Sequence, residues 1–354
     1  MSTPAGPTNA ELAALRRPAA GNPTWRAVRN YQAINIVVLV TLFLGFCTGY
    51  SLLYPDQLRF ASLGNLSVLS QQVPVTAIVA IGVGLLMIGG EFDIAVAGTF
   101  TLVPFVVAIT SAGSWGWPIG VSLLAGLAVA LLIGLMNGMI TTRLGIPSFI
   151  ATLGTMFFMR GVIRFVSLNP TTKQPDNIAF FPGDALKALL GGQIIGPIYA
   201  QMLWLIGVAL IGYALLNRHR FGNHLLLTGG NRDAAVAVGV PVRNVKVTAF
   251  MLCAVTAGFA GILQGVRINQ VEPSFATISG LELKAIAAVV VGGTSLFGGR
   301  GAILGIILGA VLIETVDNIL VLISAPETIF KGFLGATTIL AVILNTVIGR
   351  RARR

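Results

Sequence analysis

The chain is a succession of long apolar runs separated by short polar segments. Each run holds roughly 20 predominantly apolar residues, the length at which an α-helix crosses the hydrocarbon core of a bilayer. The runs are continuous and do not alternate between apolar and polar positions, which favours helices over a transmembrane barrel. We therefore predict an all-α polytopic membrane protein with about ten transmembrane helices. The predicted spans are residues 33–54, 66–88, 94–112, 118–140, 147–168, 198–216, 245–267, 284–299, 301–323 and 328–348.

The composition supports this class. Hydrophobic residues make up 55% of the 354 positions, charged residues only 10%, and the mean hydropathy is +0.87. A soluble domain with so little charged surface would aggregate, so the soluble classes are excluded. Cys47 and Cys253 both fall inside apolar spans, and therefore neither a disulfide framework nor a metal site is indicated.

The net charge is +11, and the Arg and Lys residues gather in three groups: before the first span, in the loop 218–246 and in the basic tail 350–354. With an even number of spans, all three groups lie on one side of the membrane. The positive-inside rule makes that side the cytoplasm, so we predict cytoplasmic N and C termini. Topology and contact with anionic lipid explain these cations better than nucleic-acid binding, and we expect no nucleic-acid partner.

The domain organisation follows from the same pattern. Residues 1–30 carry four prolines among mostly polar residues and are predicted to form a disordered cytoplasmic arm. Residues 31–349 form one transmembrane domain, and 350–354 form the tail.

The stretch "LLMIGGEFDIAVAGTF" (85–100) places two carboxylates between apolar runs, with no cation beside them in sequence. An ionised carboxylate that faces lipid costs several kcal/mol, so Glu91 and Asp93 face a cavity, a partner or the aqueous boundary. Gly89 and Gly90 favour a helix break, which is tolerated at membrane depth only against protein or water. We predict that this break lines a translocation path; a tight surface turn with two solvated acids is the alternative.

A second stretch, "AIAAVVVGGTSLFGGRGAILGIILGA" from Ala285, has the same pattern as the region that begins at Ala77. In each, an Ala/Val/Ile-rich run is broken by Gly-Gly and followed by a second run that contains glycines. Duplicated broken segments in the two halves of a membrane protein often mark a transport path. We therefore add Gly292, Gly293 and Thr294 to the predicted path. The small-residue bias of packed membrane helices would explain the similarity equally well.

Four further charges lie inside predicted spans. Arg160 and Arg164 are one turn apart in the fifth span, and Glu314 and Asp317 are three residues apart in the ninth. Counted from the cytoplasmic ends of their helices, both pairs lie about 20 to 25 Å up. We predict that they pair inside the bundle, as a structural feature more than as a direct substrate contact.

The loop "GNHLLLTGGNRDAAVAVGVPVRNVKV" (222–247) is too polar to cross the bilayer. Asn231 is placed to cap a short helix through Ala234 and Ala235, Gly239 to end it, and Pro241 to prevent its continuation. We predict a compact helical knob over residues 229–241; an ordinary interhelical turn is the alternative.

This loop resembles the coupling segment of the permeases of ABC importers. "GGNRDAAVAVGV" is similar to that segment in the ribose/xylose/arabinose branch of the family. Three further stretches resemble motifs of the same branch, in the same order along the chain: "GGEFDIAVAG", "PSFIATLGTMFFMRG" (147–161) and "GLELKAIAAVVVGGTSLFGGRGAILGIILGA" (280–310). Together the four matches cover most of residues 70–310.

The resemblance implies the transmembrane subunit of a binding-protein-dependent ABC importer, with no enzymatic activity of its own, in a bacterial inner membrane. Such a subunit moves a monosaccharide or related polyol by alternating access. It works as an expected homodimer with an ATP-binding ABC subunit, which holds the ATP and Mg, and with an extracytoplasmic solute-binding protein. No cofactor is expected on this chain, and no G-x-x-x-x-G-K-[ST] motif occurs. The residues that correspond to the ATPase-coupling loop are Gly230, Asn231, Arg232, Asp233, Ala234, Ala235 and Gly239.

Two alternatives remain open. One is a nucleoside or branched-chain amino-acid permease of related fold; the other is an ion-coupled secondary transporter in which Glu91 and Asp93 bind protons or sodium. The chain also departs from the family pattern: Ala95 stands where a serine is usual, and Glu314 stands where the family is apolar or small. The sequence does not name the substrate.

Overall fold

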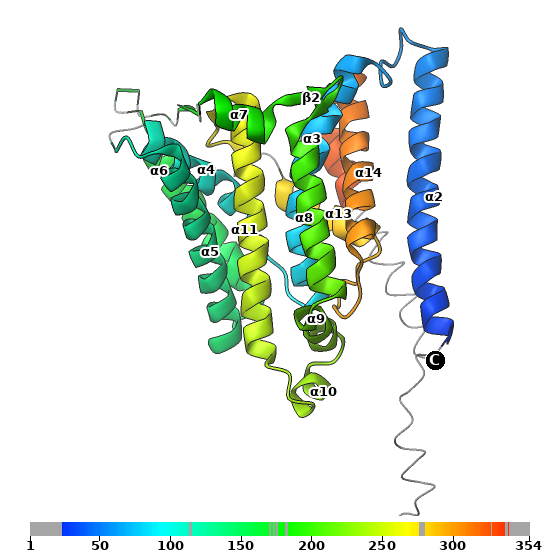
Figure 1. Cartoon of the computed structure of the whole chain (residues 1–354), viewed down its shortest axis with the longest axis vertical. Helices are drawn as coiled ribbons and strands as arrows, with labels where there is room; N and C mark the ends of the chain where they lie inside the picture. The colour runs from blue at the N-terminus through cyan, green and yellow to red at the C-terminus, as the bar shows by residue number, and fades with distance from the viewer. Residues whose placement is uncertain are drawn as a thin grey trace, which may run out of the picture.

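The computed structural model describes residues 23–112, 115–169, 171–172, 174, 176–180, 183–275, 280–326, 328–336 and 339. Within these residues the chain forms a bundle of helices (Figure 1). The helices are α2 (Pro23–Leu53), α3 (Leu63–Ile88), α4 (Val96–Ala112), α5 (Ile119–Arg143), α6 (Ser148–Val166), α7 (Asp184–Gly191), α8 (Ala200–Asn217), α9 (Arg220–Gly230), α10 (Arg232–Ala237), α11 (Val242–Ile268), α13 (Leu281–Val291) and α14 (Ile303–Leu322).

Seven of these helices, α2, α3, α5, α6, α8, α11 and α14, are long and apolar enough to cross a membrane, and the chain is a multi-pass membrane protein. Two predicted spans are shorter than expected: α4 has 17 residues, and α13 has 11 because it ends at Val291. The predicted count of about ten is therefore not reached among the described residues. The tenth span (328–348), the tail and residues 1–22 of the arm lie wholly or mostly outside them, and α2 begins inside the arm at Pro23.

The centre of the bundle is formed by α3 and α11. Within their apolar windows, 89% of the α3 residues and 72% of the α11 residues are buried, against 22% for α2 and for α5. In Figure 1, α5 and α6 lie to one side of α11, while α14 and then α2 lie beyond α3. The outer helices therefore keep an apolar surface for lipid, and the two central helices hold the contacts of the core.

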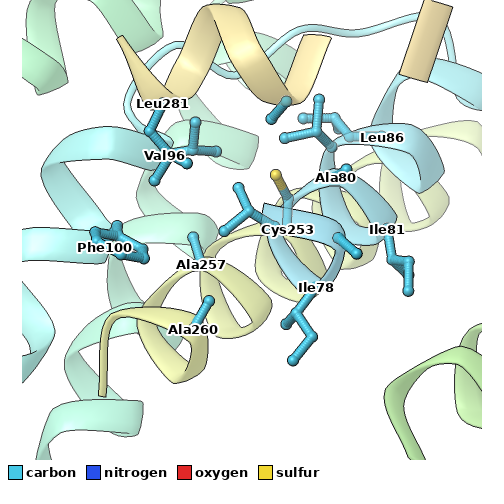
Figure 2. Packing of buried hydrophobic residues seen from close by; sticks show 14 of the residues in the cluster. Ile78, Ala80, Ile81, Leu86, Val96, Phe100, Cys253, Ala257, Ala260 and Leu281 are labelled. Atoms are coloured by element: carbon cyan, nitrogen blue, oxygen red, sulfur yellow. The ribbon is translucent and has the colours of Figure 1, made fainter. Parts of the chain in front are cut away.

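Small side chains let the central helices approach closely. Figure 2 shows Cys253, Ala257 and Ala260 of α11 among larger residues such as Ile78 and Phe100. All three α11 residues are fully buried. Membrane helices gain little from hydrophobic burial against one another, because lipid is equally apolar, so such close packing stabilises the bundle.

Short elements close the two ends of the bundle. At one end, called here the α7 end, α7 lies near two antiparallel strand pairs, β1 (Ile178–Ala179) with β4 (Gln270–Val271) and β2 (Gln193–Ile195) with β3 (Ile198–Tyr199). At the other end, the α10 end, α9 and α10 form the connection between α8 and α11 (Figure 1). The two ends thus differ in structure.

Candidate functional site

The first glycine pair ends α3 and does not kink a continuous helix. Gly89 keeps helical dihedral angles, and Gly90 has a φ of +82°, a value that residues with a side chain rarely adopt. The amide of Gly90 donates to the carbonyl of Met87 at 2.9 Å, and the amide of Glu91 donates to that of Leu86 at 3.3 Å. This is a Schellman motif, which satisfies carbonyl groups at the helix end. The predicted helix break is therefore confirmed.

The second glycine pair repeats this geometry at the end of α13. Gly293 has a φ of +85°, and its amide donates to the carbonyl of Val290 at 2.9 Å. The amide of Thr294 donates to the carbonyl of Val289 at 3.1 Å. The stretches around Gly89–Gly90 and Gly292–Gly293, which have a similar sequence pattern, therefore have the same helix cap as well.

The first break and the loop that follows the second break meet the end of α9 at a cluster of five residues, called here the glycine junction: Gly90, Gly229, Gly230, Gly298 and Gly299. The amide of Gly299 donates to the carbonyl of Ile88, the last residue of α3, at 2.8 Å. A Cβ on Gly298 would lie 2.8 Å from the Cα of Gly229 and 3.0 Å from that of Gly90. A Cβ on Gly299 would lie 2.6 Å from the Cα of Gly230. Only glycine permits backbones this close.

The helix predicted after the junction is present as α10. The side chain of Asn231 accepts a hydrogen bond from the amide of Ala234 at 3.1 Å, and Gly239 has a φ of +81° after the helix end. Ala235 is only 2% exposed, so α10 is anchored to the protein by one face. The sequence missed α9, although His219 caps it by accepting from the amide of Phe221. A residue with cap chemistry before an apolar-periodic segment was the available signal.

Glu91 and Asp93 differ in their surroundings. The Glu91 carboxylate forms an ion pair with Lys246 in the second turn of α11, 155 residues away in sequence. Asp93 is 1% exposed, and its Oδ1 accepts a hydrogen bond from the amide of Ala95 at 2.7 Å, just before α4 begins. Asp93 is therefore not a solvated acid, whereas Glu91 lies in the wall of a cavity at the α10 end. Asp93 satisfies an amide at a helix start.

A cavity of 430 Å³ opens beside Glu91 at the α10 end. It lies between α10, the start of α11, the end of α5 and the loop that leads to α6, and Glu91 and Lys246 form part of its wall. Its other lining residues are Thr141, Thr142, Gly145, Ile146, Pro147, Arg232, Val236, Pro241, Val242, Arg243 and Asn244.

A second charged cluster lies between α3, α13 and α14. Lys284 of α13 lies 2.5 Å from the Oδ2 of Asp317 and 3.8 Å from the Oε1 of Glu314. The hydroxyl of Thr76 in α3 donates to the same Glu314 oxygen at 2.6 Å. Because Glu314 is 4% exposed, these partners stabilise a charge that water reaches poorly. The cluster borders a cavity of 100 Å³ that Gln264 and Arg267 of α11 also line.

The predicted pairing of Arg160 and Arg164 with Glu314 and Asp317 is wrong. Arg160 lies 3.8 Å from the Oε1 of Glu282, Arg164 is exposed, and α6 is separated from α14 by the centre of the bundle (Figure 1). The prediction rested on the equal depth of the two pairs of charges in the membrane. The rise per residue gives that depth but not the position of each helix within the bundle. The actual partner, Lys284, was visible in the sequence as a lysine inside an apolar stretch.

Among the described residues, no group of three or more His, Cys, Asp or Glu side chains is placed to hold a metal ion. Cys47 and Cys253 are both buried and free.

Comparison with known proteins agrees with the architecture. Residues 65–342 match the family model described as the permease component of a branched-chain amino acid transport system. The chain is 31% identical over 321 residues to the xylose/arabinose import permease protein XylH of Sulfolobus acidocaldarius, covering 89% of this chain and 84% of the relative. It is 32% identical to the L-arabinose ABC transporter permease protein AraH of Azospirillum brasilense, covering 89% and 88%.

Two other relatives have the same level of identity. The ribose import permease protein RbsC of Escherichia coli K12 is 32% identical, covering 81% of this chain and 86% of the relative. The autoinducer 2 import system permease protein LsrC of Yersinia pestis is 32% identical, covering 86% and 83%. No solved structure matches the chain.

Proposed function

The chain belongs to the family of permease components of branched-chain amino acid transport systems, and from this membership we propose that it is the transmembrane subunit of an ATP-driven ABC importer. The importer carries a monosaccharide or related polyol across the inner membrane by alternating access. The chain itself catalyses no reaction and binds no cofactor; ATP and Mg belong to the partner ATPase.

The glycine junction is the observation that carries this proposal. An ABC importer needs a segment that moves together with the ATPase and transmits this motion to the membrane-embedded helices. α10 is a capped helix at the end of the bundle, and Gly229 and Gly230 directly precede its cap residue, Asn231. The same two residues contact Gly90 after α3 and the pair Gly298–Gly299 in the loop between α13 and α14. A shift of α10 therefore acts on the end of α3 and on the loop between α13 and α14 through backbone contacts that have no side chains to absorb the motion.

The charge distribution supports a cytoplasmic position for the α10 end, and with it cytoplasmic termini. Five cations lie in the 218–246 connection that forms this end: Arg218, Arg220, Arg232, Arg243 and Lys246. Cytoplasmic loops of membrane proteins carry such an excess of Lys and Arg. The partner ATPase then docks on α10, and the solute-binding protein delivers substrate to the α7 end.

The translocation path runs between the two charged regions. The cavity beside Thr76, Lys284 and Glu314 is the substrate-contacting part. The residues of the two glycine breaks are expected to border the path nearer the α10 end during transport: Gly89, Gly90, Glu91, Asp93, Gly292, Gly293 and Thr294. Carboxylate and amide oxygens accept hydrogen bonds from sugar hydroxyl groups, and ammonium and guanidinium groups donate to them. A path for branched-chain amino acids would instead need an apolar pocket for the side chain.

The relatives' names favour a sugar cargo, since three of the four reported above import ribose, xylose or arabinose. The fourth imports autoinducer 2 at the same identity, so identity alone does not select the cargo. The lining of the path, rich in hydroxyl-binding groups, is the second argument for a monosaccharide or polyol. We expect two copies of this chain in the importer, because each supplies one α10 for one ATPase.

The test is uptake into vesicles that hold this chain with its ATPase and its solute-binding protein. We expect uptake of a labelled monosaccharide that depends on internal ATP and continues when ionophores collapse the ion gradients. Uptake that ignores ATP and stops with the gradients would overturn the proposal and would make Glu91 and Asp93 candidates for ion ligands. ATP-driven uptake of leucine but of no sugar would support an ABC importer and contradict the sugar as its cargo.

A further inference from the structure

Three side chains separate the cavity beside Lys284 and Glu314, called here the charged cavity, from a second and smaller one. Phe100, Gln264 and Phe275 line the charged cavity of 100 Å³. The same three residues line a space of 10 Å³ beside strand β4, which is room for about one water molecule. Since β4 belongs to the α7 end, these three residues, called here the partition, lie between the charged cavity and that end of the bundle.

The charged cavity is too small for the proposed substrate in this structure. Its 100 Å³ is well below the roughly 300 to 1,000 Å³ that is typical of small-molecule sites. Toward the α10 end it is followed by packed core, because Ile78 of α3 and Ala285 and Ala288 of α13 are fully buried. Toward the α7 end, the partition separates it from the second cavity. The barrier is therefore thinner on the side of the α7 end.

Contacts within the partition hold it closed. The ring centroids of Phe100 and Phe275 lie 5.6 Å apart, with an angle of 31° between the ring planes. This separation is within the range in which aromatic rings attract one another. The Oε1 of Gln264 accepts a hydrogen bond from the Nε of Arg267 at 3.0 Å, which fixes the amide group beside the rings. The partition is thus an aromatic pair with one polar edge.

Phe275 is the member of the partition that can move at the lowest cost. Phe100 lies in α4 and is 2% exposed, and a Cβ on Gly261 of α11 would lie 1.9 Å from its carbonyl oxygen. Gln264 lies in α11 and is 6% exposed. Phe275 instead lies in the connection between α11 and α13, where it is partly buried. Connections open at a lower free energy than packed helices, so displacement of the Phe275 ring is the smallest change that joins the two cavities.

We propose that Phe275, closed against Phe100, is the barrier that substrate displaces to enter the charged cavity from the α7 end. The role of the charged cavity as the substrate site rests on the proposed function, whereas the barrier follows from the contacts of the ring. With the ring in place, the cavity is separated from the α7 end; with the ring displaced, the two cavities become one passage. Phe275 therefore controls access to Lys284 and Glu314.

The barrier is tested by the access of a thiol reagent to the charged cavity. Val75 of α3 lines this cavity and is 5% exposed, so Val75→Cys places a thiol there, in a chain whose Cys47 and Cys253 are replaced by alanine. The full-length chain in nanodiscs is treated with a charged methanethiosulfonate, and mass spectrometry follows the modification. Asp56→Cys, at an exposed position near the α7 end, gives the rate of an open thiol. We expect Val75→Cys to react about 100-fold more slowly, because the ring must first be displaced.

Two substitutions and a matched control assign the barrier to Phe275. Phe275→Ala removes the ring and should raise the rate at Val75→Cys about tenfold, whereas Phe275→Leu keeps apolar bulk and should raise it less. Phe259→Ala removes a ring of α11 that packs edge-on against Trp204, with centroids 5.2 Å apart, and that lines neither cavity. This control should leave the rate unchanged. The Tm of each variant in the same nanodiscs shows that it is folded, and Phe275→Leu decides if Phe275→Ala is not.

Three results would overturn the proposal: Val75→Cys reacting as fast as Asp56→Cys, folded Phe275 variants that leave the rate unchanged, or an equal rise with Phe259→Ala. The same reaction in intact cells, where the reagent stays outside, separates the barrier from the proposed function. A rise in nanodiscs and in cells supports the barrier with the α7 end outside. A rise in nanodiscs alone supports the barrier and contradicts the proposed orientation. Neither measurement depends on ATP or on the identity of the substrate.

Discussion

The two glycine breaks have the same cap and different surroundings. After α3 and after α13, a glycine in helical conformation is followed by one with positive φ, and the next amide bonds back to the helix. Beyond the first break come charged groups, with Glu91 paired to Lys246 and Asp93 at the start of α4. Beyond the second comes another glycine pair, Gly298 and Gly299, in contact with the end of α9.

The difference shows that two similar sequence stretches have one role in common, capping a helix, and a second role in which they differ, the contacts made after the cap. The cap only ends a helix and satisfies its carbonyl groups, and any Gly-Gly pair in this setting can do that. The residues that follow decide what the break contacts. The first break contacts α11 through the ion pair of Glu91 and contacts Gly229 through its backbone. Beyond the second break, Gly298 and Gly299 contact Gly229 and Gly230 through backbone atoms. Substitutions at matched positions of the two breaks can therefore separate capping from coupling.

The largest effect is expected at the junction itself. A Cβ on Gly229 would lie 1.9 Å from the carbonyl oxygen of Ile88 and 2.6 Å from the amide nitrogen of Gly299, both backbone atoms with little freedom to move. We expect Gly229→Ala to lower the free energy of unfolding by about 3 kcal/mol or more and to abolish uptake. Thermal unfolding in nanodiscs and vesicle uptake measure the two effects.

The adjacent residue is the control. A Cβ on Gly230 would have its nearest neighbour, the Cα of Gly299, at 3.8 Å, an ordinary contact. Gly230→Ala should therefore retain stability and most of the uptake. If both substitutions were equally harmless, the close approach of these backbones would be refuted.

The second effect concerns the two lysines that pair with carboxylates, Lys246 and Lys284. Lys284→Met strands two carboxylates, one of them 5% exposed in its side chain, and should cost about 3 to 5 kcal/mol. Lys246→Met leaves Glu91 beside an open cavity where water replaces the lysine, and should cost about 1 kcal/mol or less. Denaturation of the purified variants compares them. Equal losses would mean that the Lys284 cluster is as well hydrated as the Glu91 pair.

A smaller and equal effect is expected at the two caps. Gly90 and Gly293 share a positive φ, and a Cβ would meet the Cα of Gly229 at 3.6 Å in one case and nothing within 4 Å in the other. Substitution by alanine should cost about 1 to 2 kcal/mol at either position, the cost of placing a side chain in the left-handed region. Unfolding midpoints that differ strongly would show that one glycine does more than end its helix.

The smallest effect is expected from Arg164→Gln. The side chain is exposed on α6 and forms no ion pair with another described residue. Its loss should change stability by no more than about 0.5 kcal/mol. A loss of several kcal/mol would revive the predicted pairing with Glu314 and Asp317.

Local features were predictable from the sequence because local chemistry determines them. The glycine pairs at 89–90 and 292–293 were expected to break their helices, and Asn231 and Gly239 were expected to bound a short helix; both features are present. Seven of the predicted spans coincide with membrane-length helices, because twenty apolar residues leave few alternatives.

Partners across the bundle were not predictable in this way. Lys246 approaches Glu91 from 155 residues away, and Lys284 approaches Asp317 because α13 and α14 pack together. Depth along a helix can be counted from the sequence, but the rotation and neighbours of that helix depend on tertiary packing. The same limit explains why two separate breaks were expected and their meeting at Gly229 and Gly230 was not.

The most direct test of the central claim is the number of ATP molecules hydrolysed per substrate imported, compared between Gly298→Ala and Gly293→Ala in the reconstituted importer. Both glycines have a positive φ, +80° and +85°, so the conformational cost is matched. Only at Gly298 would the new Cβ enter the junction, 2.8 Å from the Cα of Gly229. The account predicts that Gly298→Ala raises the ratio several-fold while Gly293→Ala leaves it at the wild-type value. Equal ratios for the two variants, at comparable stability, would contradict a role of the glycine junction in coupling.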